Sequence, residues 1–272
     1  GIATGALLLL MALFRRKSFY IYPVGLAGCV LAGLVNGIGS IFYYSALGRI
    51  DASIGHLLYS FYPLFVAIWL LLDRYPINRL TIFRLALSIP GMVLLVSAGH
   101  TTVDLIGAGF MLLSAVLYAL HVIINQRVLY EVPAPTVTLY TLMSMTLTVF
   151  IAFLVFRPQL PPSDASWWPV LGMALITFLS RLTLFFGIKH LGGLQTALLG
   201  ISELLITVVL AQRWLGETMS PLQWVGAGFV FASLVLVGFD RFTPEKRHGA
   251  GMLAWLNPPK IPTSDVPWHS QP

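Results

Sequence analysis

The feature that most limits how this chain can fold is a series of long apolar runs separated by short links. A helix of about 20 apolar residues crosses the hydrocarbon core of a bilayer, and most of the runs have about that length. They do not alternate between apolar and polar residues as the strands of a membrane barrel would. The chain is therefore predicted to be an all-α polytopic membrane protein. Its nine runs cover residues 1–14, 22–47, 52–72, 80–98, 105–126, 135–156, 166–188, 194–214 and 219–239.

Composition supports the membrane class and excludes several others. Only 26 of the 272 residues are charged (16 basic and 10 acidic), and 57% are hydrophobic. A soluble domain carries about 25% charged residues and could not cover its surface with so few. Because Cys29 is the single cysteine, neither an intramolecular disulfide nor a cysteine metal site is expected, and no cofactor is predicted.

The placement of basic residues predicts an orientation. If the N-terminus of the intact protein, expected upstream of Gly1, is cytoplasmic, 12 of the 16 basic residues lie on the cytoplasmic side, and Arg49, Arg157 and Arg213 lie on the other. This asymmetry predicts a multi-pass inner-membrane protein with a cytoplasmic C-terminus. Because the charges are spread over the links, no nucleic-acid partner is expected. The twelve are Arg15, Arg16, Lys17, Arg74, Arg79, Arg84, Arg127, Lys189, Arg241, Lys246, Arg247 and Lys260, with Arg84 expected to reach the membrane surface from one turn inside its helix.

A weak internal repeat divides the chain. A shift of 141 residues places 44–50 on 185–191 and keeps helices and links in phase. The 105–126 run then has no partner and the first run is too short to span, so a helix is expected upstream of Gly1. Five helices per half give the halves inverted topology. The predicted units are a truncated first repeat over 1–99, a second repeat over 105–240, and a flexible, mostly solvated tail over 241–272.

Polar side chains inside the runs are the candidate functional residues, because they are costly in lipid and usually face protein or a water-filled cavity. Their spacings of three or four place them on one face of each helix. Arg181 suits an anionic or carboxylate group of a substrate. Glu203 suits a cationic group or a coupling proton, with His56 as a second proton-binding group. The other predicted substrate-binding residues are Asn36, Ser40, Tyr44, Tyr59, Tyr118, His121 and Phe185.

Structural roles compete with these assignments. Serine and threonine in membrane helices often bond to a carbonyl of their own or a neighbouring helix, and this role is favoured for five of them. The two histidines suit packing as well as function, and Arg181 could simply pair with Glu203. Pro63 and Pro90 predict helix bends. The five hydroxyl residues are Ser40, Ser60, Ser114, Thr177 and Thr207, and close helix contacts are predicted at Gly28, Ala32, Gly33, Gly37, Gly228 and Ala232.

Short motifs in both halves resemble those of a known family. The first half has Tyr44-Ser45-Ala46-Leu47, Asp51-Ala52-Ser53 and Pro63, and the second has Glu203, Trp214-Leu215-Gly216-Glu217 and Gly226. In these the chain resembles the EamA family of the drug/metabolite transporter superfamily. Leu204 stands where the family usually has proline, and Asp73-Arg74-Tyr75-Pro76 where Gly-Glu is usual. The resemblance implies two inverted five-helix repeats, with nine helices present and ten in the intact protein, and an exporter of amino acids or other small metabolites.

The main functional hypothesis is a secondary transporter that works by alternating access around a midplane cavity between the halves. Its partners would be a small-molecule substrate and the lipid bilayer, and a homodimer is left open. No metalloprotease, nucleophile-elbow or nucleotide-binding motif is present, so an enzyme is not expected. The alternative is an intramembrane enzyme with Glu203, His56 or His121 as acid and base, which requires these groups within hydrogen-bond reach of one another. A receptor or lipid scramblase ranks third, because the peripheral helices are apolar.

Overall fold

The computed structural model describes residues 5, 19–50, 52–75, 77–96, 104–157, 168–210, 213, 220–236 and 251–256, and across these residues the chain is all-α. Four helices are long and apolar enough to cross a bilayer, namely α2 (Pro23–Leu47), α6 (Leu105–Leu129), α7 (Ala134–Phe156) and α8 (Trp168–Leu191). The others are α3 (Ala52–Tyr59), α4 (Tyr62–Leu72), α5 (Arg79–Val96), α9 (Gly193–Gly200), α10 (Ser202–Leu210), α11 (Pro221–Val235) and the short 3-10 helix η4 (Ala254–Leu256). The predicted all-α polytopic membrane fold is confirmed. Apart from Gly5, the first predicted run lies outside the described residues, and so does the Leu-Gly-Glu motif.

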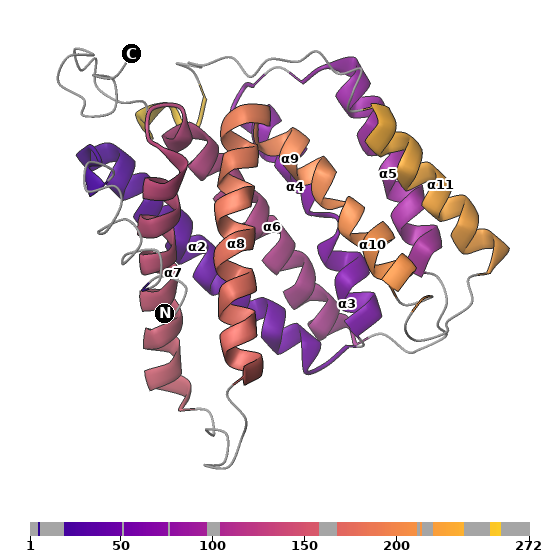
Figure 1. The fold of residues 1–272 in the computed structure, drawn as a ribbon, viewed down its shortest axis with the longest axis horizontal. Helices are drawn as coiled ribbons and strands as arrows, with labels where there is room; N and C mark the ends of the chain where they lie inside the picture. The colour runs from indigo at the N-terminus through magenta and orange to yellow at the C-terminus, as the bar shows by residue number, and fades with distance from the viewer. Residues whose placement is uncertain are drawn as a thin grey trace.

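The helices form three groups (Figure 1). Helix α2 packs along α6 and α7, with α8 beside α7, while α5 and α11 pair on the opposite side of the molecule. The short helices α3, α4, α9 and α10 lie between these groups. This arrangement places the short helices next to α6, against which both α3 and α4 pack.

Glycines on α2 allow the close approach of α7. A Cβ added at Gly33 would lie 2.5 Å from Ser144 Cβ and 2.5 Å from the Thr141 carbonyl oxygen, and one at Gly37 would lie 2.8 Å from Thr148 Cβ. The structure differs on α11, because a Cβ at Gly228 would meet nothing within 4 Å. The tight contact between α5 and α11 is made instead at Gly91. A small-residue motif therefore allows close helix packing, but it does not by itself show that another helix lies against that face.

Two runs that the sequence predicts as continuous helices are each broken in the middle. The 52–72 run is divided into α3 and α4 at Ser60, and the 194–214 run into α9 and α10 at Ile201. Pro63 lies in the first turn of α4, where its missing N–H costs nothing, which accounts for the first break. Pro90, by contrast, lies inside the continuous helix α5.

The two breaks are related by the internal repeat. Adding 141 to the bounds of α3, Ala52–Tyr59, gives 193–200, and α9 is Gly193–Gly200. The interruption after each of these eight-residue helices therefore falls at the same place in both halves. Helices α4 and α9 also pack against each other, so the two breaks lie close together in space.

Arg84 is placed differently from the sequence expectation. Instead of reaching the membrane surface, its side chain is fully buried, with 0% exposed. Its Nε donates to the Ser233 carbonyl oxygen of α11 (3.2 Å) and its Nη1 donates to Gln195 Oε1 of α9. A buried guanidinium with several hydrogen bonds ties α5 to α9 and α11, which a sequence argument from its position along the helix could not anticipate.

One segment of the C-terminal tail, which the sequence predicts to be mostly solvated, packs against the helices. Residues 251–256 lie against the end of α4, where the Leu253 N–H donates to Asp73 Oδ1 (2.9 Å). The side chains of Leu253 and Leu256 are buried, and Leu256 lies over Gly28 of α2. The rest of the tail lies outside the described residues.

Candidate functional site

A polar cavity lies where the two helix breaks meet. It has a volume of about 80 Å³ and is lined from both halves of the chain. Helices α2 and α3 contribute Tyr43, His56 and Tyr59, and α10 contributes Glu203. The rest of the lining is Ser60 and Ile201 at the breaks, with Tyr62 and Gly200 at the adjoining ends of α4 and α9.

Tyrosine rings form one wall of the cavity. The ring centroids of Tyr43 and Tyr59 are 5.1 Å apart at 76°, and those of Tyr59 and Tyr62 are 5.8 Å apart. Behind them, Tyr118 of α6 lies 5.1 Å from Tyr62 in an edge-to-face contact. Such tilted and edge-to-face pairs are the favoured aromatic geometries, so this tyrosine wall, Tyr43, Tyr59, Tyr62 and Tyr118, is a stable surface.

A direct bond joins the two breaks. The Tyr62 hydroxyl of α4 donates to the Ala197 carbonyl oxygen of α9 (3.0 Å). That hydroxyl occupies the space that a side chain at Gly200 would need, so the glycine allows the two broken helices to meet. Ser60 Oγ donates to the His56 carbonyl oxygen (2.7 Å) at the other break.

Of the charged candidates, Glu203 and His56 line the cavity and Arg181 does not. Glu203 lines the cavity with an exposed side chain, and His56 lines it half-buried. The Arg181 guanidinium lies 5.6 Å from the centroid of Tyr118, in a cation–π contact outside the cavity lining. Within the part of the chain that the structure describes, no salt bridge joins Arg181 to Glu203. Both side chains therefore lie near the tyrosine wall without pairing with each other.

His121 is a buried packing residue in this structure. Its Nδ1 lies 3.0 Å from the Ala32 carbonyl oxygen, and because a carbonyl only accepts, Nδ1 carries the proton. Asn125 donates to the His121 carbonyl oxygen (2.9 Å) and accepts a bond from Thr141 (3.1 Å). Phe185 is also buried, with its ring centroid 5.9 Å from that of His121. Neither side chain reaches the cavity lining.

Three further candidates lie away from the cavity. Asn36 donates to Met145 Sδ (3.3 Å) at the interface with α7, and Ser40 donates to the Asn36 carbonyl oxygen (2.9 Å). Tyr44 is 66% exposed and contacts its neighbour Tyr43 edge to face. The favoured carbonyl-bonding role is found for Ser40, Ser60, Ser114 and Thr177, while the side chain of Thr207 lies outside the described residues.

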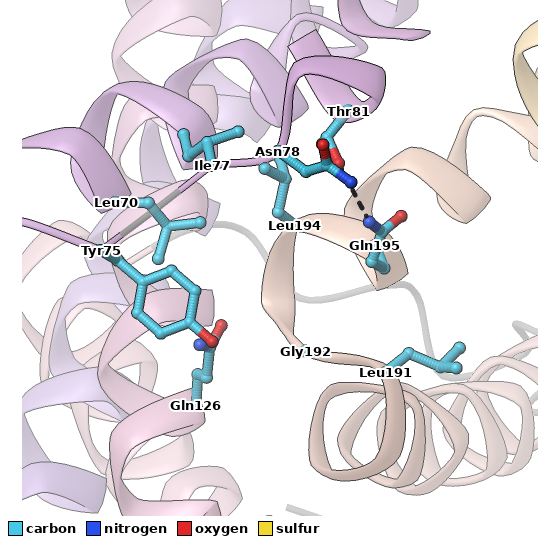
Figure 2. Close-up of a pocket in the computed structure, with 10 residues that line it drawn as sticks. All are labelled: Leu70, Tyr75, Ile77, Asn78, Thr81, Gln126, Leu191, Gly192, Leu194 and Gln195. Atoms are coloured by element: carbon cyan, nitrogen blue, oxygen red, sulfur yellow. Dashed lines mark hydrogen bonds between the residues drawn. The ribbon is translucent and has the colours of Figure 1, made fainter. Parts of the chain in front are cut away.

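The sequence did not predict the helix breaks or the role of Tyr62 in this cavity, and it did not predict a second, smaller pocket. The repeat offset alone, which maps Ser60 onto Ile201, could have indicated the breaks, whereas Tyr62 resembles any aromatic residue in an apolar run. In a smaller pocket, polar side chains at the ends of α5, α6 and α9 lie among apolar ones such as Leu70 and Leu194 (Figure 2). There, Gln195 Nε2 donates to Thr81 Oγ1 (3.3 Å) and Gln126 Oε1 accepts from the Gly193 N–H (2.7 Å).

The described residues do not form a metal site. No group of three or more histidine, cysteine, aspartate or glutamate side chains there lies close enough to hold an ion.

Comparisons with known proteins agree with the fold and with a transport role. The uncharacterized transporter sll1319 of Synechocystis sp. is 24% identical over 229 residues, which is 80% of this chain and 67% of that protein. The UDP-galactose transporter homolog 1 of Emericella nidulans is 27% identical over 88 residues, which is 32% of this chain and 19% of that protein. One solved crystal structure shares the fold, with a TM-score of 0.63 at 17% identity over 87% of this chain and 96% of the other. The model of the EamA-like transporter family matches residues 105–239, and this multi-pass membrane protein belongs to that transporter family.

Proposed function

We propose that this membrane transporter is a secondary carrier that moves a small organic solute by alternating access, with the cavity at the two helix breaks as its binding site. The observation that carries the proposal is that the breaks fall at equivalent positions of the two halves and share one polar cavity. Inverted-repeat carriers commonly bind their substrate at such discontinuous helices near the midplane.

Residues at the breaks are suited to the movement that alternating access requires. Hinges are loop or helix-end positions that absorb changes in backbone angles. Ser60 and Ile201 are such positions, and the Tyr62 hydroxyl bonds the Ala197 carbonyl across the two broken helices. Exchanging that bond during rocking would need no change inside the long helices.

The finer assignments are also part of the proposal. We infer two inverted repeats over 1–99 and 105–240, an inner-membrane location with a cytoplasmic C-terminus, and export of amino acids or other small metabolites. The orientation is supported by three basic residues at the C-terminal ends of α4, α6 and α8, namely Arg74, Arg127 and Lys189. The segment 251–256 lies at this same end of the bundle. Glu203 and His56 are the proposed proton-binding groups, since both line the cavity.

The enzyme alternative has less support. Its acid and base would have to lie within hydrogen-bond reach of one another. His121 is committed to the Ala32 carbonyl, and among the described residues no hydrogen bond joins His56 to Glu203. The relatives, moreover, are transporters.

The test is solute efflux from proteoliposomes that contain the full-length protein and a mixed pool of amino acids and other metabolites. Mass spectrometry would identify the solutes that leave. Gly200→Leu should reduce efflux at least about tenfold, because the new side chain displaces Tyr62 and fills the cavity. Gly172→Leu is the matched control, since a Cβ there meets nothing within 4 Å, and it should leave efflux unchanged.

Two results would contradict parts of the proposal. If no solute leaves wild-type vesicles under any gradient, the carrier function is wrong. If efflux occurs but does not respond to a collapsed proton gradient, proton coupling through Glu203 and His56 is wrong while the carrier function stands.

A further inference from the structure

The charge of the cavity lining has a definite sign. Among its described lining residues, Glu203 contributes a carboxylate and none is lysine or arginine. The lining is therefore acidic, which favours the positive end of a ligand.

The aromatic faces reinforce this preference. Tyr43, Tyr59 and Tyr62 line the cavity. The ring planes of Tyr43 and Tyr59 meet at 76° and those of Tyr59 and Tyr62 at 40°, so the three rings do not share one plane. A cation near the face of an aromatic ring is attracted by the ring quadrupole, and cages of several rings are a recurrent means of recognising ammonium groups. Glu203 and the rings thus act on the same kind of ligand group.

Arg181 does not reverse this sign. Its guanidinium lies over Tyr118, behind the rings that line the cavity. It is not among the residues that line the cavity. A carboxylate on the same substrate would be drawn toward Arg181, whereas an ammonium group would be drawn toward Glu203.

We propose that the cavity recognises an ammonium group, so that the substrate class is small organic amines, including zwitterions that carry one. The ammonium group would lie between Glu203 and the rings of Tyr43, Tyr59 and Tyr62. The cavity of about 80 Å³ has room for several waters, enough for such a head group. This inference rests on the proposed function, since it names the substrate of the same site.

The test is isothermal titration of the full-length protein in detergent with three probes that share a carbon skeleton. These are 3-methylbutylamine, leucine and 4-methylpentanoate, which carry an ammonium group, both charges, and a carboxylate alone. We expect the amine to bind and the carboxylate to bind at least about tenfold more weakly. Leucine binding beside the amine would indicate a zwitterionic substrate, and amine binding alone would indicate a simple amine. Equal binding of the carboxylate, or no binding of amine and leucine at millimolar concentration, would overturn the proposal.

Variants separate the charge from the rings. Glu203→Gln should weaken amine binding about tenfold or more and leave the carboxylate unaffected. Tyr59→Leu should weaken it about two- to thirtyfold, while Tyr59→Phe, which keeps the ring face, should stay within about threefold. Tyr44→Leu is the control because that side chain lies outside the cavity. Unchanged amine affinity in Glu203→Gln protein with a wild-type melting temperature would also overturn the proposal.

Failure of this inference can be told apart from failure of the carrier function. Efflux of anionic or neutral solutes that persists in Glu203→Gln vesicles would leave the carrier standing and remove the ammonium site. Amine binding that depends on Glu203, in vesicles that release no solute, would do the reverse.

Discussion

Asp73 and Arg127 form an ion pair that is sealed from solvent, with side chains 0% and 3% exposed. Arg127 Nε donates to Asp73 Oδ2 at 3.0 Å, and the other carboxylate oxygen accepts from the Leu253 N–H. From the sequence, Asp73 is only a departure from a family motif. Its structural role depends on Arg127, 54 positions along the chain, and on a segment near the C-terminus.

Removing one partner of this ion pair should strongly destabilise the protein. Asp73→Ala leaves Arg127 buried without its counter-charge and the Leu253 N–H without its acceptor, a change that costs about 3–5 kcal/mol in other proteins. Thermal unfolding in detergent would measure it. Arg49→Gln, which removes the exposed pair with Asp104, is the control and should shift the melting temperature little. A small shift for Asp73→Ala would mean that water reaches this pair.

The two histidines illustrate what residue type alone leaves open. Sequence reasoning treated His56 and His121 as equally suited to packing and to function. In the structure His121 is fully buried and bonded to a carbonyl of α2, whereas His56 lines the cavity. The two side chains differ because different helices lie against them. The spacing of residues within one helix does not show which neighbouring helix each side chain will face.

At the scale of elements, α2 is held by its fit against α7. Gly33→Ala would force the new methyl group into Ser144 and the Thr141 backbone, which must move apart. Overpacking of this kind costs about 1–3 kcal/mol, so a lower melting temperature is expected. Gly109→Ala on α6 is the matched control, since nothing lies within 4 Å, and better helix propensity should leave it neutral or slightly stabilising. Equal melting temperatures for the two variants would contradict the close α2–α7 contact.

The start of α6 makes a pH-dependent contribution. Asp104 caps this helix, and its pKa is lowered from the ordinary value chiefly because the Ile106 N–H donates to the carboxylate, with Arg49 adding to the effect. A lowered folded-state pKa means that the stabilisation is present above the unfolded pKa of about 3.9 and is lost as the pH falls through the folded value. Asp104→Asn keeps a capping oxygen without titrating.

The measurement is the melting temperature of wild type and Asp104→Asn between about pH 6 and pH 3. The advantage of wild type should be present at pH 6 and shrink toward pH 3. Parallel curves would show that the carboxylate charge does not stabilise the cap.

At the scale of the whole molecule, the segment 251–256 closes one end of the bundle. Leu256 is fully buried against α2, so Leu256→Ala should lower stability by about 2–5 kcal/mol, the usual cost of such a cavity. Trp255→Ala nearby is the control, because its side chain is 52% exposed. Thermal unfolding should separate the two. Similar melting temperatures would support the solvated tail that the sequence predicted.

Sequence by itself determined the class of the molecule. Runs of about 20 apolar residues are predicted to cross a bilayer as helices, because a helix pairs its own backbone groups and an unpaired backbone group in lipid costs too much free energy. The repeat of 141 residues and the motifs around Glu203 led from there to the family, and the family match over residues 105–239 agrees. These signals are local or periodic, so one sequence is enough to contain them.

Only the tertiary structure decided which polar groups meet. It broke two predicted helices at equivalent positions and joined the breaks through Tyr62 and Gly200. It also turned Arg84 inward and left Tyr44 on the outside. Each outcome depends on contacts between residues far apart in the chain. Burial and hydrogen bonding are properties of the packed arrangement. The type of a residue determines the free-energy cost of burying it without a partner, but it does not determine whether the residue is buried or which partner it meets.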